Sequence, residues 1–162
     1  WKVRLGMPEQ TTPDYFLLLN EIGIIGQLSR ALLEARLPPG FVVAQFSVLN
    51  HLVRVGDGKT PLVIAQAFQV PTNSMTHSLN VLEREGLIET RKNPLDGRSK
   101  LVYVTDKGRM FRDDVLGALA PDIRRIAAVF PPDFVARLLP DLEMLRKFLD
   151  ADRDVPKLDT PK

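Results

Sequence analysis

The sequence contains no cysteine, so disulfide bonds, thiolate metal sites and cysteine-based redox sensing are excluded. It has two histidines, His51 and His77, and neither has a carboxylate at a spacing typical of a metal site or an acid–base pair. No glycine-rich phosphate loop is present either. These absences argue against an enzyme, and we expect no catalytic residue, no metal site and no cofactor.

Long apolar runs are also lacking. No unbroken apolar stretch approaches the roughly 18–20 residues that cross a bilayer, so we expect no membrane partner. The absence of cysteine fits a reducing compartment, and we expect a cytoplasmic protein. The sequence begins with Trp1 rather than Met, so we expect residues to be missing at its start, and no signal peptide is evident.

What is present is an ordinary globular composition. The 162 residues are 44% hydrophobic and 26% charged, which predicts one domain, with room for an appended helical element. The net charge of +2 is too small to indicate a nucleic-acid partner by itself. The placement of charge is more informative, because residues 91–100 contain Arg91, Lys92, Arg98 and Lys100 and a single acidic residue, Asp96.

The first periodic segment predicts a helix from Asp14, as its N-cap, to about Leu37, where Pro38-Pro39-Gly40 ends it. Its apolar residues occupy more than one face, and such a helix has to be covered on more than one side. A chain of this size lacks the mass to do so alone, so we expect a second subunit to cover it. Residues 1–13 lack periodicity and are predicted to form an N-terminal arm.

Three shorter helices and a hairpin are predicted next. The helices cover about 41–55, 61–68 and 73–85; Thr60 caps the second, and Gly86 closes the third in a left-handed conformation. Residues 87–92 and 100–104 alternate like paired strands around the turn residues 93–97.

The remainder of the chain is predicted to be helical up to about residue 150. Thr105-Asp106 caps the next helix. Pro121 and Pro140 are expected to kink or split the helices that contain them, because an interior proline costs about 3 kcal/mol. Residues 151–162 are polar and contain prolines, and we predict a disordered tail there.

The helix over 73–85 carries two different faces. Met75, Leu79 and Leu82 mark a buried side. The polar residues, which we predict to contact DNA, are Asn73, Ser74, Thr76, His77, Asn80 and Arg84. Short hydrogen-bonding side chains near a helix N-terminus can read base edges in the major groove, and an asparagine can pair with adenine through two hydrogen bonds. The N-terminus itself favours a phosphate.

The hairpin adds a basic tip to this helix. Arg98 suits the minor groove, where a narrow A·T tract concentrates negative potential. Lys92 and Lys100 are expected to contact phosphates, which position the protein and make its affinity depend on salt.

These residues resemble the MarR family of winged helix-turn-helix transcriptional regulators. The resemblance covers about 14–150 and is strongest in 45–49, 76–88, 93–99 and 104–108. Its most specific piece is the Asp96-Gly97-Arg98 motif: in the family, the matching arginine reaches the minor groove and the aspartate orients it. The resemblance implies a mainly α fold with a small β-hairpin wing.

The same resemblance implies how the chain is organised. Residues 14–40 and 106–150 are expected to form a helical dimerisation region, in which the N- and C-terminal helices of two chains interleave. Residues 41–105 are expected to form the winged helix-turn-helix DNA-binding lobe.

The function implied is that of a homodimeric, sequence-specific transcriptional regulator, usually a repressor, that binds a pseudo-palindromic operator in double-stranded DNA. Many family members are released from DNA by a phenolic or other aromatic effector. Tyr15, Phe16, Phe46 and His51 are candidates to line an effector pocket, or else belong to the core. The chain departs from the family at His77, where an arginine is usual, and at Val63, where a glutamate is common.

A second hypothesis is a winged-helix module that binds protein and no longer reads DNA. It is motivated by His77, the small net charge, and the nearby acidic residues Glu83, Glu85 and Glu89.

Overall fold

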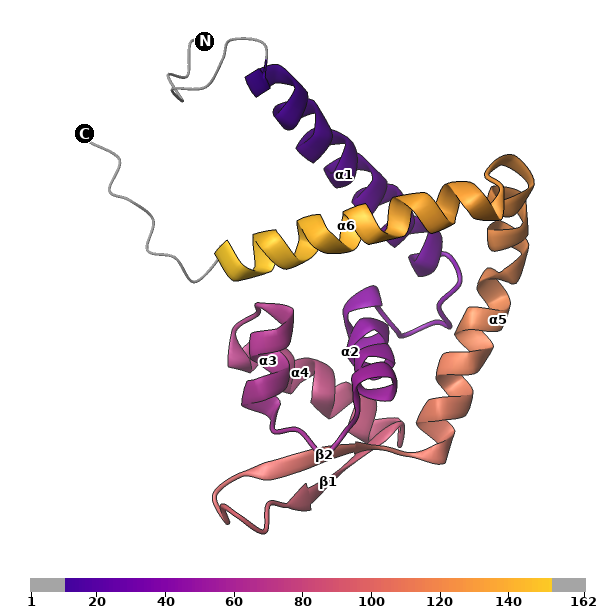
Figure 1. The fold of residues 1–162 in the computed structure, drawn as a ribbon. Coiled ribbons are helices and arrows are strands. Elements are labelled where there is room, and N and C mark those ends of the chain that lie inside the picture. Colours follow the sequence, from indigo (N-terminus) through magenta and orange to yellow (C-terminus); the bar gives the residue numbers. More distant parts are fainter. Residues whose placement is uncertain (1–10, 153–162) are drawn as a thin grey trace, which may run out of the picture. The chain divides into compact units, whose positions relative to one another are not determined.

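The computed structural model describes residues 11–152, with side chains for residues 14–151. Its elements, in chain order, are α1 (Thr11–Glu34), α2 (Val43–Val55), α3 (Pro61–Phe68), α4 (Thr72–Arg84), β1 (Ile88–Lys92), β2 (Lys100–Val104), α5 (Asp106–Val129) and α6 (Pro132–Asp152) (Figure 1). The predicted mainly α fold with a β-hairpin wing is confirmed. The chain forms two compact units, Trp1–Leu119 and Ala120–Lys162, and α5 begins in the first and ends in the second.

Helix α1 begins earlier than predicted. It starts at Thr11, so Asp14 lies in the first turn and is not the N-cap. Proline is tolerated in a first helical turn, where its missing N–H has no hydrogen-bond partner to lose. The helix can therefore begin before Pro13. Of the predicted arm, residues 1–10 lie outside the described residues. The helix ends at Glu34. A tight turn follows, in which the N–H groups of Arg36 and Leu37 donate to the carbonyls of Leu33 and Glu34.

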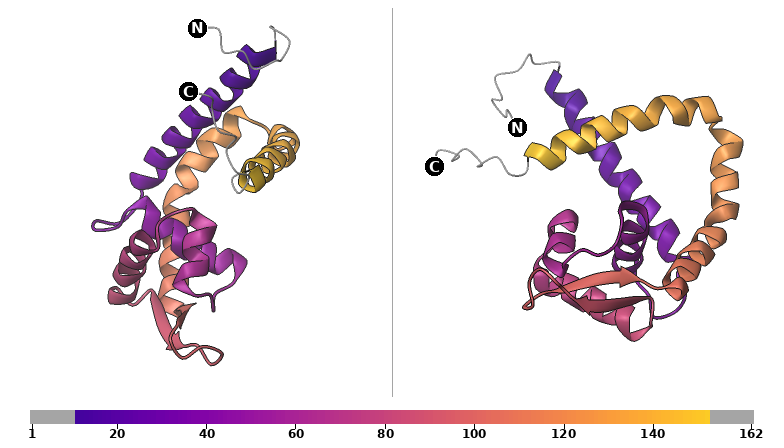
Figure 2. Two further views of the ribbon diagram at one scale, coloured as in Figure 1. Left: turned by 90° about the vertical axis from the view of Figure 1, so that its left-hand side faces the viewer. Right: turned by 60° about the horizontal axis from the view of Figure 1, so that its bottom comes forward.

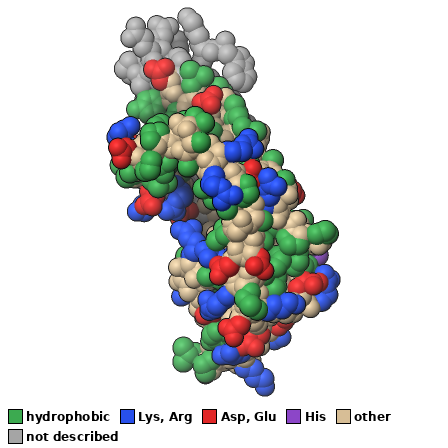
Figure 3. Space-filling view, turned by 90° about the vertical axis from the view of Figure 1, so that its right-hand side faces the viewer, with side chains coloured by type: hydrophobic (Ala, Val, Ile, Leu, Met, Phe, Trp, Pro, Cys, Tyr) green, Lys and Arg blue, Asp and Glu red, His purple; other side chains and the backbone are tan. Residues whose placement is uncertain are grey.

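Most apolar side chains of α1 are exposed. The large ones are Tyr15, Phe16, Leu17, Leu18, Leu19, Ile24, Ile25 and Leu28. By length and composition, residues Asp14–Glu34 could cross a membrane, and none of that window is buried. The helix meets this criterion without an unbroken apolar run of that length, because Glu21 and Arg30 interrupt its sequence without making it polar, and the absence of a membrane partner stays a prediction. Figure 3 shows hydrophobic side chains at the surface of the molecule among scattered charges.

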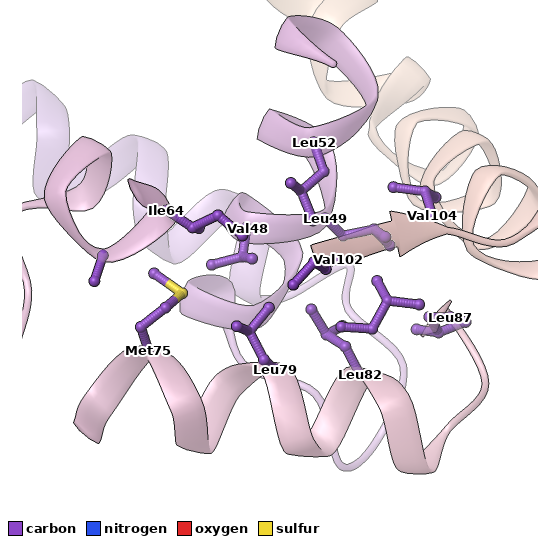
Figure 4. Close-up of a cluster of buried hydrophobic side chains, with 12 residues drawn as sticks. Val48, Leu49, Leu52, Ile64, Met75, Leu79, Leu82, Leu87, Val102 and Val104 are labelled. Carbon is purple, nitrogen blue, oxygen red and sulfur yellow. The ribbon is translucent and has the colours of Figure 1, made fainter. Parts of the chain in front are cut away.

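The lobe from α2 to β2 is built on one hydrophobic core. Its buried cluster consists of Val48, Leu49, Leu52, Ile64, Ala65, Met75, Leu79, Leu82, Leu87, Ile88, Val102 and Val104. Figure 4 shows Met75, Leu79 and Leu82 pointing from α4 toward side chains of the other elements. The predicted buried face of α4 is therefore confirmed.

The hairpin pairs antiparallel, from Ile88 opposite Val104 to Lys92 opposite Lys100. A short third segment joins β2, since the N–H of Gly58 donates to the Val102 carbonyl at 2.7 Å and the N–H of Val102 donates to the Lys59 carbonyl at 2.9 Å. Beyond this paired part, the hairpin tip projects away from the helices of the lobe (Figure 2).

The segment Thr105–Gly108, at the start of α5, is hydrogen-bonded to the C-terminal end of α4. The Thr105 hydroxyl donates to the Gly86 carbonyl at 2.7 Å and accepts from the N–H of Gly108 at 3.0 Å, which confirms Thr105 as a cap. Lys107 Nζ donates to the Glu85 carbonyl at 2.7 Å. A Cβ at Gly108 would lie 2.0 Å from the Leu87 carbonyl oxygen, so only glycine fits there. Gly86 has the predicted left-handed conformation, with φ of 70°.

Neither interior proline ends its helix. Helix α5 runs through Pro121 to Val129, and α6 runs through Pro140 to Asp152. The predicted splits are therefore wrong. The φ angle of proline is compatible with an α-helix, and each ring removes one hydrogen bond from helices of 24 and 21 residues, whose other turns persist.

Candidate nucleic-acid interface

The polar side chains of α4 lie at the surface. Its six predicted DNA-contacting residues, Asn73, Ser74, Thr76, His77, Asn80 and Arg84, are all exposed, whereas Met75, Leu79 and Leu82 are buried. The helix therefore offers one continuous polar face to a partner outside the lobe. The role of each of these residues in DNA binding stays a prediction.

Two hydroxyl groups on this helix are engaged by its own backbone. Thr76 Oγ1 donates to the Thr72 carbonyl at 2.9 Å, and Ser78 Oγ donates to the Ser74 carbonyl at 3.4 Å. A hydroxyl that donates inward keeps its lone pairs for a donor from outside. Thr76 can therefore accept from a base amino group and place its methyl group against an apolar base edge.

The N-termini of the two helix-turn-helix segments differ. In α3, Thr60 Oγ1 accepts from the N–H of Val63 at 3.3 Å. In α4, the N-cap is Pro71, which supplies no side-chain hydrogen bond. The first-turn N–H groups of α4 are thus left uncapped by a side chain, and such groups favour an anion such as a phosphate.

The tip of the wing is held by hydrogen bonds from Asn93 and Ser99. Asn93 Oδ1 accepts from the N–H of Leu95 at 3.0 Å, and Asn93 Nδ2 donates to Ser99 Oγ at 2.8 Å. The Ser99 N–H and hydroxyl both donate to the Asp96 carbonyl, at 3.0 and 3.2 Å. Sequence reasoning placed Asn93 in the turn, on the Asn-Pro signal at 93–94, but assigned Ser99 no role in holding it.

Asp96 acts on Arg98 through the backbone. Asp96 Oδ1 accepts from the main-chain N–H of Arg98 at 3.0 Å. Among the described residues, no ion pair joins the Asp96 carboxylate to the Arg98 guanidinium. The aspartate thus fixes where the Arg98 side chain leaves the main chain, while the guanidinium stays available for a partner.

Lys92 and Lys100 flank the tip as a cross-strand pair, and both side chains are exposed. Like charges directly opposite on a hairpin destabilise it. An anion placed between the two ammonium groups would relieve that repulsion, so the pair is suited to a phosphate.

Other charges near the wing are engaged within the chain. Arg91 donates to Glu89, and its guanidinium lies 4.4 Å from the centre of the Tyr103 ring. Arg84 Nε donates to Glu85 at 3.3 Å, and Glu83 accepts from the Thr90 hydroxyl at 2.8 Å. The glutamates that motivated the protein-binding hypothesis therefore each have a partner in the same chain.

A depression of about 480 Å³ lies between the start of α3 and the tip of the wing. Its lining combines the start of α3 with the hairpin and consists of Thr60, Pro61, Leu62, Asn93, Asp96, Arg98, Ser99 and Lys100. It brings the N-terminus of α3 next to two predicted DNA-contacting cations.

The four effector-pocket candidates have different environments. Phe46 is buried, with 3% of its surface exposed, whereas Tyr15 and Phe16 are exposed on α1. His51 is partly buried and meets the Phe68 ring edge-on, with 5.1 Å between ring centres. Burial lowers the pKa of His51 below 6.5, and the nearby charge of Arg54 lowers it further. None of the four lines the depression at the wing, and their ligand role stays a prediction.

Comparisons with known proteins point to the same class of protein as the geometry of α4 and the wing. A family model described as the MarR family matches residues 40–99. YkoM, an uncharacterized HTH-type transcriptional regulator of Bacillus subtilis (strain 168), is 31% identical over 94 residues, which are 58% of this chain and 60% of that protein. The matched region thus spans less than two thirds of that relative.

Solved structures match over a larger share of the chain. A cysteine-to-serine mutant of MarR from E. coli, complexed with operator DNA, is 25% identical with a TM-score of 0.68, covering 83% of this chain and 97% of that one. A MarR transcriptional regulator from Methanosarcina mazei Go1 has the same fold, with a TM-score of 0.72 at 18% identity, covering 81% and 94%. Family and fold are those of transcriptional regulators, not of enzymes. Residues 40–99 thus match the MarR family, and the fold of the chain is that of MarR-family winged helix-turn-helix regulators.

Proposed function

We propose that this regulator is a cytoplasmic homodimer that binds a pseudo-palindromic operator and acts as a repressor. The observation that carries the DNA-binding part is the wing tip, where hydrogen bonds fix the backbone and leave the Arg98 guanidinium without an ion-pair partner in the described chain. A fixed backbone with an available cation is what insertion into a narrow minor groove needs.

The two parts of the interface would divide the work. The α4 face would read base edges in the major groove through Asn73, Thr76, His77 and Asn80, with Ser74 and Arg84 at its ends. Lys92 and Lys100 would bind phosphates on either side of the wing. The E. coli MarR structure, which is complexed with operator DNA, supports DNA as the partner.

Dimerisation is supported by the exposed apolar surface of α1. We assign residues 14–40 and 106–150 to the dimerisation region and 41–105 to the DNA-binding lobe. A second chain would bury the apolar side chains that this chain leaves in water. Such burial is the dominant favourable contribution to the free energy of association. Two recognition helices related by a two-fold axis would then read half-sites about 10 bp apart.

Effector release is the remaining part of the proposal. An aromatic ligand bound near Tyr15, Phe16, Phe46 and His51 would release DNA only by binding more tightly to a dimer whose recognition helices are wrongly spaced. The protein-binding hypothesis is not retained as a second function, because Glu83, Glu85 and Glu89 are already hydrogen-bonded within the chain.

The test compares two arginines of one hairpin by gel shift, using the gene's own upstream region and fragments selected from a random pool. Arg98→Ala is expected to weaken DNA binding by about 10-fold and to lower the slope of affinity against salt by about one counterion. Arg91→Ala is the matched control, since Arg91 is already paired with Glu89 and stacked on Tyr103. Sedimentation should give the same dimer for both variants.

Absence of any salt-dependent shift by the wild-type protein would contradict DNA binding. A dimer lost on Arg98→Ala would instead contradict the assignment of Arg98 to the DNA surface.

A further inference from the structure

Leu95 is the most exposed large hydrophobic side chain in the described part of the chain, at 94%. Single exposed leucines are common on protein surfaces and need no explanation by themselves. This one lies in the turn beyond the last strand pair, Lys92 and Lys100, where the tip would meet the proposed DNA partner.

The main chain around Leu95 is held in place before any partner arrives. Asn93 Oδ1 accepts the Leu95 N–H, and the N–H of Asp96 donates to the Asn93 carbonyl at 3.3 Å. Pro94 fixes its own φ angle directly before Leu95. Because the backbone is already ordered, burying the leucine on a partner would not require ordering the loop first.

The surroundings of Leu95 indicate what kind of partner would bury it. Arg98 leaves the same tip three residues later, and Lys92 and Lys100 stand at its base. An apolar group among three cations does not match an apolar protein surface, which would have to desolvate those charges. It matches a polyanion with apolar walls, and the minor groove has deoxyribose carbons lining its sides between two rows of phosphates.

We propose that Leu95 packs against the sugar wall of the minor groove that Arg98 enters, and that it adds affinity and a preference for narrow, A·T-rich sequence. The inference rests on the proposed DNA-binding function. Proteins that enter the minor groove commonly bring apolar side chains such as leucine together with arginine. Here both come from one hydrogen-bonded turn, so they enter the groove as a unit.

The salt dependence of binding separates this role from that of a charge. Leu95→Ser is expected to weaken binding about 5-fold with no change in the salt slope, since leucine neutralises no phosphate and contributes by apolar burial. Leu95→Met should restore most of the lost affinity. Arg98→Ala should change both affinity and slope. Because Leu95 is exposed, the circular dichroism spectrum and melting temperature of Leu95→Ser should equal those of the wild type.

A second arm replaces A·T pairs under the wing by G·C pairs, leaving the half-sites unchanged. Wild-type protein should lose affinity on this exchange, and Leu95→Ser should lose less. If wild type fails to bind DNA at all, the proposed function and this inference both fall. If wild type binds and Leu95→Ser binds equally well, or changes the salt slope, only the inference on Leu95 is wrong.

Discussion

The lobe from α2 to β2 and helix α1 differ in how far their apolar side chains are buried. In the lobe, twelve side chains from α2, α3, α4 and the hairpin segment form one buried cluster. In α1, the helix has as many apolar positions as any element, yet most of its large apolar side chains are exposed. Apolar periodicity thus shows which residues need cover, but not whether the cover comes from the same chain.

The largest difference between the two regions should appear on truncating one leucine in each. Leu49 is fully buried, and Leu49→Ala should lower the free energy of unfolding by about 3 kcal/mol through lost burial and a cavity. Leu28 is 66% exposed, so Leu28→Ala removes little burial within one chain and should instead weaken self-association. Urea unfolding at several protein concentrations, with sedimentation at equilibrium, measures both.

Gln27→Ala is the control on the same helix, because it removes a polar side chain and no apolar area. If Leu28→Ala leaves self-association unchanged, a second chain does not cover the face of α1 that carries Leu28. The assignment of residues 14–40 to the dimerisation region would then be wrong.

A smaller effect is expected from two glycines of α5. A Cβ at Gly108 would collide with the Leu87 carbonyl, so Gly108→Ala should destabilise the lobe by about 2 kcal/mol through overpacking. Gly117 has no atom within 4 Å of an added Cβ, and Gly117→Ala should stabilise the helix by about 0.5–1 kcal/mol. Thermal and urea unfolding compare the two variants directly. Destabilisation by both would mean that the middle of α5, around Gly117, is as tightly covered as its first turn.

The smallest expected effect concerns His51 within the lobe. Its folded-state pKa lies below 6.5, because burial and Arg54 disfavour the charged ring. Below pH 6.5 the unfolded chain therefore takes up a proton more readily than the folded one, and stability falls as the pH drops toward the folded pKa. Above pH 6.5 this contribution is fully present. Urea midpoints between about pH 7.5 and 5 should show a slope that His51→Gln reduces.

His77→Gln is the matched control, since His77 is the other histidine of the chain and is exposed on α4. A slope that disappears with His77→Gln and persists with His51→Gln would contradict the assignment.

Most of the lobe could be predicted because its signals are local. Thr60 and Pro61 fix the start of α3, and Gly86 fixes the end of α4, so each element is defined by two or three adjacent residues. Spacings of four and three placed Met75, Leu79 and Leu82 on one face, and that face is the buried one. The splits expected as one outcome at Pro121 and Pro140 are wrong, because a proline's local cost does not outweigh the remaining turns of a long helix.

The sequence by itself determined the helix-turn-helix, the hairpin and the polar face of α4, since capping, turn chemistry and periodicity act between neighbours in the chain. Only the tertiary structure decided which charges remain available. The sequence singled out Arg98 by its motif, and the structure adds that Arg91 is held by Glu89 and Tyr103, while Arg98 lies on a turn that Asp96 fixes through the backbone. Cross-strand and turn contacts depend on where side chains meet in space, and one-dimensional spacing does not carry that information.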